Sequence, residues 1–387
     1  MAPTDPYTPA GAPCGLYIHL PFCAGRCPYC DFFAQPHAAG QARALIPALL
    51  RHLEMIAPLA GGRALAHVYL GGGTPSLLPA QAIAALLEAV TSSLTLAPDC
   101  EVSLEANPGS LSLGKLKALK QAGVNRLSLG AQSFEPGLLQ ALGRRHSPAD
   151  TRRAFIQARA AGLANLSLDL IYALPGQTRQ AARADILAAL ELAPDHISLY
   201  ELTLGPATPF GRAYVKGRPP LPDEDTVLAM EDTALGLLEA AGLKRYEVSN
   251  FARPGRECRH NQDTWRGGDY LALGPGAHGH LAGRRWAWAA DVEAYVAGVV
   301  AGHPLLEFSE ELTPDQQAQE LVMLGLRTAE GVDLERLRAL LGQDLRRRWS
   351  QPLARLLAQG WARLEPGRLR PTALGLRLAD AAAGLFF

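Results

Sequence analysis

The sequence predicts an α/β fold in which parallel strands alternate with helices. From residue 15 to about residue 205, short apolar runs rich in β-forming residues alternate with alanine- and leucine-rich stretches of helical periodicity. Six strands joined by helical crossovers form either a layered sheet or an incomplete barrel. In both folds, ligands bind at the carboxyl ends of the strands, and polar residues recur there. We therefore expect a functional site at that edge of the sheet.

The expected elements follow one another along the chain. The strands are 15–20, 67–71, 101–106, 126–131, 165–171 and 196–201. The helices lie near 38–58, 79–95, 111–122, 148–162 and 178–192. Beyond about residue 305 the composition shifts, and helical patterns near 314–328 and 333–350 precede a turn-rich β pair. That order predicts a winged-helix-like cap at the end of the chain.

Composition excludes several classes of protein. The chain has 387 residues, which exceeds one ordinary domain, and 48% of them are apolar. Its 37 basic and 37 acidic residues give zero formal net charge, which argues against a dedicated nucleic-acid-binding protein. The first residues show no targeting peptide, and no apolar run is long enough to span a membrane. We therefore expect a cytoplasmic protein.

The most informative motif is the C-x3-C-x2-C spacing of Cys23, Cys27 and Cys30. Three thiolates can hold three irons of a [4Fe–4S] cluster and leave the fourth iron open to a small molecule, whereas most iron–sulfur sites use four cysteines. Phe32 stands two residues after Cys30, so no fourth cysteine follows closely. The spacing therefore favours a cluster with one open iron.

Two other kinds of site compete with this interpretation. A structural zinc ion needs four ligands, and His19 or His37 could supply the fourth. The pair Cys27 and Cys30 also has the spacing of a thioredoxin-type redox motif, but that hypothesis leaves Cys23 without a role and lacks the expected strand–helix surroundings. The iron–sulfur hypothesis explains all three cysteines.

Polar residues lie at or near the ends of three of the expected strands. A glycine turn, 71–73, follows the second strand and could expose backbone N–H groups to a carboxylate. Glu105 ends the third strand, Gln132 follows the fourth, and Asp169 lies within the fifth. A carboxylate inside a buried strand is costly unless it is paired or functional. Each residue alone could be a satisfied core polar group, but their recurrence indicates a polar pocket.

These motifs together carry a family resemblance. The runs that start at Tyr17, Gly71, Glu105, Gly130, Gly143 and Asp169 appear in this order in one branch of the radical S-adenosylmethionine (SAM) superfamily. The chain resembles that branch, which comprises oxygen-independent coproporphyrinogen III dehydrogenase and the HemW-type heme chaperone. The resemblance implies a radical SAM partial (β/α)6 barrel, with Cys23, Cys27 and Cys30 holding the cluster. It implies a SAM site formed by Tyr17, Gly72, Gly73, Thr74, Glu105, Gln132, Arg144, Asp169 and Thr203.

The resemblance also suggests a division into four parts. We expect a flexible start at 1–14, the radical SAM core at 15–215, an α+β extension on the heme or substrate side at 216–305, and a helical, winged-helix-like domain at 306–387.

Two features separate the branches. The dehydrogenase that this chain resembles carries a fourth cysteine where Phe32 stands. Residues 260–265 resemble the heme-binding signature H-N-x-x-Y-W of the chaperone, with Thr264 in place of the tyrosine. His260 would be the axial ligand of the heme iron, Asn261 would orient it, and Trp265 would stack on the porphyrin.

Three further residues near this motif could reach iron. Cys258 is a candidate second ligand, although its spacing to His260 is not that of covalent heme attachment. The segment 269–280 reads as a tight glycine- and proline-containing loop that would strap over the active site, and it carries His278 and His280.

The resemblance favours a heme chaperone that binds heme and passes it to acceptor hemoproteins such as respiratory cytochromes. Its cofactors would be a [4Fe–4S] cluster, SAM and heme, and a flavodoxin or ferredoxin would reduce the cluster. We expect no nucleic-acid partner, and the sequence is compatible with peripheral contact to a membrane. The leading alternative is an oxygen-independent coproporphyrinogen III dehydrogenase. Radical SAM modification of RNA is a third hypothesis, and the zero net charge disfavours it.

Overall fold

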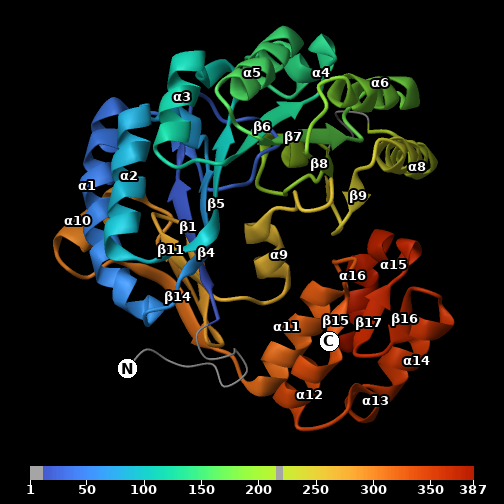
Figure 1. Cartoon of the computed structure of the whole chain (residues 1–387). Coiled ribbons are helices and arrows are strands. Elements are labelled where there is room, and N and C mark those ends of the chain that lie inside the picture. Colours follow the sequence, from blue (N-terminus) through green and yellow to red (C-terminus); the bar gives the residue numbers. More distant parts are fainter. Residues whose placement is uncertain (1–11, 215–220) are drawn as a thin grey trace.

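A twelve-stranded mixed sheet dominates the structure (Figure 1). The computed structural model describes residues 12–214 and 221–387. The order of its strands is β14-β13-β12-β11-β1-β4-β5-β6-β7-β8-β10-β9, and β14 and β9 form the two edges. The predicted flexible start, 1–14, lies mostly outside the described residues, and the four-part division of the chain remains a prediction.

The predicted parallel strands form the centre of this sheet. They are β1 (Cys14–Leu20), β4 (Leu65–Gly72), β5 (Leu96–Ala106), β6 (Arg126–Gln132), β7 (Asn165–Tyr172) and β8 (His196–Glu201), and each pairs with its neighbour in parallel. The crossovers contain α1 (Ala39–Ile56), α2 (Ala80–Ser93), α3 (Leu113–Gln121), α4 (Pro136–Ala141), α5 (Pro148–Ala160) and α6 (Arg179–Leu190). The predicted α/β fold is therefore confirmed, and its sheet is open.

Every central strand alternates between two kinds of side chain. One face carries the buried aliphatic residues, which pack against the outer helices. Examples are Leu16, Ile18, Leu70, Leu104, Leu127, Leu168 and Ile197. Burying each such side chain stabilises the fold by about 1.5–3 kcal/mol. The opposite face carries tyrosine, serine, histidine, arginine and carboxylate side chains at the intervening positions. A two-residue period separates the hydrophobic core from a polar interior face.

The sheet extends beyond the predicted strands at both sides. β11 (Tyr270–Leu273) joins β1 in parallel, and β12 (His278–Leu281), β13 (Arg284–Trp288) and β14 (Leu306–Glu311) continue in antiparallel order. On the far side, β10 (Asn250–Ala252) and β9 (Lys244–Arg245) run antiparallel beyond β8. The prediction of one tight loop over 269–280 was wrong in part, because its apolar start, Tyr-Leu-Ala-Leu, pairs with β1; only 274–277 forms the turn.

Four helices complete this part of the molecule. They are α7 (Pro209–Tyr214), α8 (Glu224–Ala240), α9 (Arg259–Trp265) and α10 (Val292–Val300). α8 packs beside α6 on the outer, apolar side. α9 is different, since it lies on the opposite side of the sheet, near the polar face (Figure 1). The cap of α9, Cys258, is buried, but the helix itself buries none of its side chains fully.

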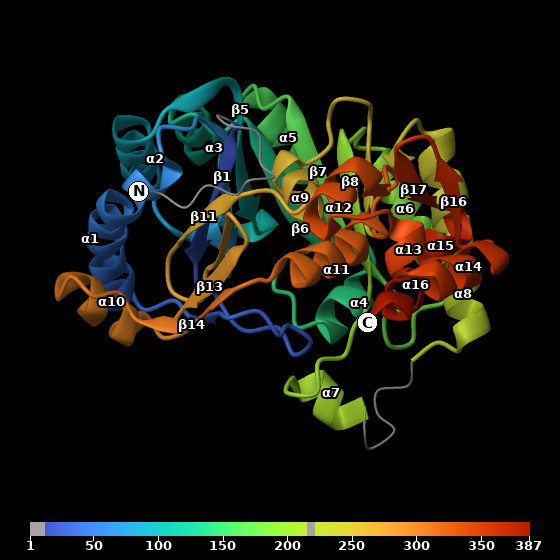
Figure 2. The same ribbon diagram turned by 90° about the horizontal axis from the view of Figure 1, so that it is seen from below.

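The last part of the chain has its own hydrophobic cluster. It contains α11 (Pro314–Gly325), α12 (Leu334–Leu341), α13 (Leu345–Arg348), α14 (Ser350–Ala358), α15 (Ala373–Arg377) and α16 (Ala379–Ala383). Its sheet has three strands rather than the predicted pair, in the order β15 (Val332–Asp333), β17 (Arg368–Pro371) and β16 (Ala362–Glu365). The predicted helix at 333–350 is divided, because Gly342 adopts a left-handed conformation with φ of 64°. Figure 2 shows this part beside α9.

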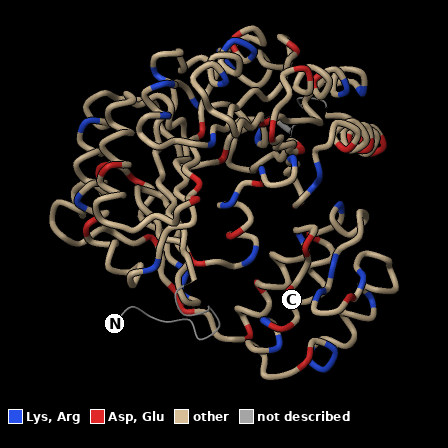
Figure 3. Tube along the Cα trace, in the orientation of Figure 1, with Lys and Arg blue, Asp and Glu red and all other residues tan. Residues whose placement is uncertain are grey.

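Basic and acidic residues are interspersed over the part of the chain that the structure describes (Figure 3). Among the residues that the structure describes, no helix is both long enough and apolar enough to cross a membrane.

Candidate functional site

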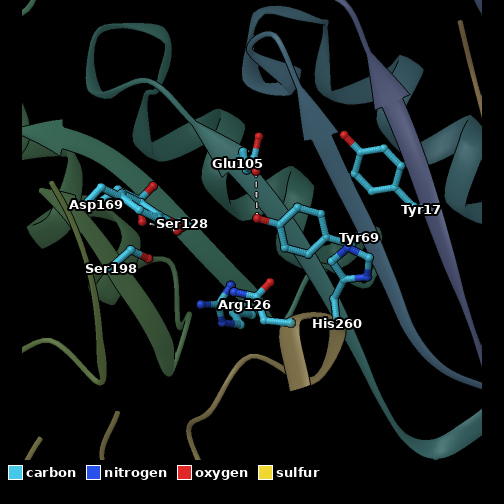
Figure 4. Close-up of a pocket in the computed structure, with 10 residues that line it drawn as sticks. Tyr17, Tyr69, Glu105, Arg126, Ser128, Asp169, Ser198 and His260 are labelled. Atoms are coloured by element: carbon cyan, nitrogen blue, oxygen red, sulfur yellow. Dashed lines mark hydrogen bonds between the residues drawn. The ribbon is translucent and has the colours of Figure 1, made fainter. Parts of the chain in front are cut away.

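A cavity of about 220 Å3 opens on the polar face of the sheet (Figure 4). Its walls come from β1, β4, β5, β6, β7, β8 and α9. The lining residues are Tyr17, Tyr69, Glu105, Arg126, Ser128, Asp169, Ser198, Tyr200, His260 and Asn261. The cavity therefore brings together three residues predicted for SAM and two predicted for heme, although they come from distant parts of the sequence.

Glu105 is held near the carboxyl end of β5 by two hydrogen bonds. Its carboxylate accepts from the Tyr69 hydroxyl at 2.7 Å and from the backbone N–H of Gly72 at 3.1 Å. Burial nevertheless raises the pKa of Glu105 to about 7, because these bonds do not offset the loss of water around the charge. At neutral pH the Glu105 carboxyl can therefore donate a hydrogen bond to a ligand in its protonated form, or accept one from a ligand in its ionised form.

Asp169 lies on the neighbouring part of the same face. Its Oδ1 accepts from the Ser128 hydroxyl at 2.8 Å and from the Ser167 hydroxyl at 3.4 Å. Burial raises the pKa of Asp169 as well. Two carboxylates on one cavity wall suit a ligand that carries an ammonium group or sugar hydroxyls.

His260 projects from α9 into an aromatic stack. Its ring lies 5.6 Å from that of Tyr17 and 4.6 Å from that of Tyr69 between centroids, and both pairs are stacked. His67 and Tyr270 meet it edge-on. Burial lowers the pKa of His260 well below its usual value, so the imidazole is neutral at physiological pH. Its Nδ1 is buried and has no hydrogen-bond partner among the described residues.

The three cysteines lie in the segment after β1, which we call the cysteine loop: Cys23 ends the short strand β2 (Phe22–Cys23), and Cys27 and Cys30 follow it. The hydroxyl of Thr74 approaches the Sγ of Cys23 at 3.6 Å, and a guanidinium nitrogen of Arg144 approaches the Sγ of Cys27 at 3.7 Å. Burial raises the pKa of Cys23 and of Cys30. Iron binds thiolates, so bound metal would have to reverse this effect. The thiols are partly exposed, free and flanked by a cation, which fits metal binding.

His19 ties this loop to the sheet. The carbonyl of Phe33 can only accept, so the Nε2 of His19 donates to it at 2.9 Å. Burial lowers the pKa of His19 to about 4, so its Nδ1 carries no proton and accepts from the Tyr17 hydroxyl at 2.9 Å. These two bonds connect the cysteine loop to the wall of the cavity.

The glycine turn brings two backbone segments together. Gly72 has a φ of 114°, a conformation that other residues rarely adopt. A Cβ on Gly73 would lie 2.7 Å from the carbonyl oxygen of Phe22. Glycine at these positions therefore lets the end of β4 pack directly against the cysteine loop. The glycine turn thus contacts the segment that carries the candidate cluster ligands.

Other predicted residues lie outside the cavity wall. Gln132, at the end of β6, has a φ of 65°, and Arg144 donates to the carbonyl of Gly130 at 2.8 Å. Thr203 is exposed and bonds only weakly, at 3.5 Å, to the carbonyl of Glu201. Trp265 ends α9 and approaches Glu247 instead of the cavity. The structure groups Arg144 with the cysteines and separates Thr203 and Trp265 from the cavity.

His278 and His280, the two further histidines predicted to reach iron or substrate, do not line the cavity. His278 is exposed at the start of β12 and faces Phe308, whereas His280 donates from Nδ1 to the carbonyl of Gly268 at 3.0 Å. Cys258 is buried, and burial raises its pKa to about 12, which disfavours the thiolate that iron would need.

Sequence reasoning missed half of the cavity wall. Tyr69, Arg126, Ser128, Ser198 and Tyr200 line the cavity without having been predicted. The sequence did contain a signal for them. Each of these residues lies an even number of positions from another polar residue of its own strand, which places both side chains on the same face of the sheet. The pairs Ser128–Glu105 and Asp169–Ser198 are also directly opposite in the strand register.

Comparisons with known proteins identify the class to which this fold belongs. The chain matches the model of the radical SAM superfamily over residues 17–189 and that of the HemN C-terminal domain over residues 312–378. In structure it resembles coproporphyrinogen III oxidase (HemN) from Escherichia coli, a radical SAM enzyme, with a TM-score of 0.85, 24% identity, and coverage of 97% of this chain and 90% of that chain. Fold and motifs thus define a radical SAM protein.

Curated relatives narrow the assignment. The heme chaperone HemW of Mycobacterium tuberculosis (strain ATCC 25618 / H37Rv) is 39% identical over 96% of this chain and 94% of its own length. The heme chaperone HemW of Escherichia coli (strain K12) is 42% identical over 70% of each chain. The chain therefore belongs to the HemW family.

Proposed function

We propose that this protein is a heme chaperone, which binds heme and transfers it to acceptor hemoproteins. The observation that carries this proposal is the 39% identity to a curated heme chaperone over 96% of the chain. The neutral state of the His260 imidazole supports it, because a neutral imidazole is the form that ligates heme iron.

We assign the [4Fe–4S] cluster to Cys23, Cys27 and Cys30, and SAM to the adjoining cavity. A cluster with one open iron can bind SAM and donate an electron to it. In this chain, Thr74 and Arg144 would support the thiolates, while Glu105 and Asp169 would hold the polar groups of SAM. Gly72, Gly73, Gln132 and Thr203 are further candidates from the family resemblance.

Heme binding through His260 requires α9 to move. The cavity of about 220 Å3 is already assigned to SAM and is smaller than the roughly 300–1,000 Å3 typical of small-molecule sites, so it has no room for a porphyrin as well. No residue of α9 is fully buried, but its movement must separate the His260 ring from Tyr17 and Tyr69 and break the ion pair of Arg266 with Glu330. Asn261 and Trp265 would then accompany His260 to the ligand.

The competing proposal is coproporphyrinogen III dehydrogenase activity. The high TM-score to HemN supports it, but at 24% identity that similarity shows the fold alone. Phe32 stands where the dehydrogenase has its additional cysteine, and its 68% exposed side chain offers no ligand atom. The chaperone is therefore the better-supported function.

The proposed setting is the cytoplasm, where reducing conditions preserve free thiols. The proposed partners are acceptor hemoproteins such as respiratory cytochromes and a flavodoxin or ferredoxin that reduces the cluster.

One preparation can test the proposal. The protein is reconstituted anaerobically with iron and sulfide, titrated with hemin, and mixed with an apo-hemoprotein. In parallel, coproporphyrinogen III and SAM are supplied with a reductant. We expect stoichiometric heme binding and transfer without porphyrinogen conversion. Robust protoporphyrinogen formation, or no heme binding, would reject the chaperone proposal.

A further inference from the structure

A chain of hydrogen bonds connects Asp169, on the wall of the cavity (Figure 4), to the start of α9. It runs through the side chains of Ser167, His196 and Tyr246, which we call the relay. The Oγ of Ser167 lies 3.4 Å from the Oδ1 of Asp169 and 2.8 Å from the Nδ1 of His196. The Nε2 of His196 lies 2.9 Å from the hydroxyl of Tyr246, which accepts from the backbone N–H of Cys258 at 3.3 Å.

An ionised Asp169 fixes the direction of every bond in the relay. A carboxylate only accepts, so the hydroxyl of Ser167 donates to it and must itself accept from the Nδ1 of His196. Burial lowers the pKa of His196 well below its usual value, so the imidazole is neutral and carries one proton, on Nδ1. The Nε2 therefore accepts from the hydroxyl of Tyr246. All the donors then point toward the carboxylate, an order in which neighbouring bonds strengthen one another.

The far end of the relay holds the start of α9. Among the residues that the structure describes, no group accepts a hydrogen bond from α9 through a capping side chain of Cys258, the residue that precedes the helix. The first backbone N–H groups are held from outside instead, that of Cys258 by Tyr246 and that of Arg259 by the carboxylate of Glu101 at 3.1 Å. His260, the proposed heme ligand, is the next residue. The relay thus ends where the segment that carries His260 begins.

We propose that the relay couples occupancy of the cavity to the hold on α9, with Ser167, His196 and Tyr246 as positioning residues. A ligand that donates hydrogen bonds to Asp169 keeps its carboxylate ionised, and an ionised acceptor forms the stronger, charge-assisted bond. The polarised relay then holds the start of α9 more firmly. SAM carries an ammonium group and ribose hydroxyls that can donate in this way, so its role here rests on the assignment of SAM to the cavity.

The coupling acts in both directions. Release of His260 for heme requires α9 to move, so SAM opposes heme binding, and heme weakens SAM binding by the same factor. This part of the inference rests on the proposed heme chaperone function. The relay between Asp169 and α9 does not.

The first experiment therefore needs no ligand. Hydrogen exchange of the amides of residues 258–265 reports the opening of α9. It is compared at neutral pH among the wild type, Asp169→Asn, Tyr246→Phe and the double variant. Each single substitution breaks the polarised relay, so we expect exchange to be faster by about fivefold or more, the lower end of typical couplings between sites. The double variant should exchange no faster than Tyr246→Phe, and effects that multiply would overturn the proposal.

A matched control tests whether the loss of any tyrosine hydroxyl has this effect. Tyr172→Phe removes a hydroxyl on β7 that bonds to Glu201 instead of the relay, and it should leave exchange of residues 258–265 unchanged.

The second experiment adds the ligands. SAM should slow exchange of residues 258–265 and weaken hemin binding in the wild type, whereas Tyr246→Phe should bind SAM and show neither effect. A tyrosine with only a structural role would change stability and leave the response to SAM intact, and that result would overturn the proposal. If the wild type binds no SAM, the assignment of the cavity fails, and if it binds no hemin, the chaperone proposal fails. In both cases the comparison without ligand still decides the relay.

One measurement requires no substitution, in case a variant fails to fold. The 15N resonances of the His196 ring in the wild type show where its proton lies. We expect a neutral ring with the proton on Nδ1 at neutral pH. A proton on Nε2, or a cationic ring, would reverse or break the relay and overturn the proposal.

Discussion

The imidazole of His260 stacks on the phenol of Tyr17, with 5.6 Å between ring centroids and 12° between ring planes. Tyr17 is a candidate SAM residue on β1, and His260 is the candidate heme ligand on α9. The same tyrosine hydroxyl bonds to His19, which in turn holds the cysteine loop. One chain of contacts thus connects the three proposed cofactor sites.

The cluster assignment can be tested by replacing each cysteine. Cys23→Ala, Cys27→Ala and Cys30→Ala should each abolish the cluster, because three thiolates are the minimum for this kind of site. Cys14→Ala and Cys100→Ala are matched controls, since these thiols are buried in β1 and β5. Iron and sulfide analysis with paramagnetic resonance provides the measurement. One zinc ion without labile sulfide would contradict the assignment.

The glycine turn offers a second test of the same site. Gly73→Ala would place a methyl group 2.7 Å from the Phe22 carbonyl, so the turn or the cysteine loop must shift. We expect reduced cluster occupancy. Gly114→Ala on α3 meets no atom within 4 Å and should be neutral or slightly stabilising. Equal cluster content in the two variants would show that the turn does not support the loop.

Asp169→Asn should weaken SAM binding by roughly 1–3 kcal/mol, the scale for losing a charged hydrogen bond. The amide keeps an acceptor for the hydroxyl of Ser128, so the fold should persist. Equilibrium dialysis against labelled SAM, alongside thermal unfolding, measures both effects. Unchanged affinity with reduced stability would assign Asp169 to the core instead.

The raised pKa of Glu105 predicts how the free energy of unfolding depends on pH. Its pKa rises from 4.5 to about 7 in the folded chain, so the folded state retains a proton that the unfolded state has lost. This contribution to stability is present below about pH 4.5 and is lost as the pH rises through about 7. Glu105→Gln cannot ionise, and its free energy of unfolding should fall less than that of the wild type over this range. Urea unfolding at several pH values gives the difference, and parallel curves would refute the prediction.

His260→Ala should shift or reduce the Soret absorption of bound heme and slow transfer to an apo-hemoprotein, because the mutation removes the proposed axial nitrogen. The cluster should remain, since His260 does not contact the cysteines. His303→Ala serves as the control, as this histidine lies on an exposed loop. Identical heme spectra for both variants would exclude His260 as the ligand.

The strands and crossover helices could be predicted because their apolar runs and helical periods are strong local signals. The polar wall was only partly predicted, because the sequence alone does not distinguish a single polar residue that lines a pocket from one that is satisfied within the core. Tyr69 and Arg126 appear as functional residues only once the alternation of each strand and the pairing of neighbouring strands are combined. The place of α9 depends on contacts with Asp99 and Glu330, far apart in sequence, which no local pattern encodes.

Those contacts have a mechanical consequence. Arg266, at the end of α9, pairs with Glu330, and the guanidinium of Arg336 donates to the carbonyls of Arg266 and Gly267. Both partners belong to the terminal part of the chain. Any outward swing of α9 must therefore break these links or carry the terminal part with it. By thermodynamic reciprocity, a protein that docks on the terminal part and loosens these links also lowers the work of exposing His260.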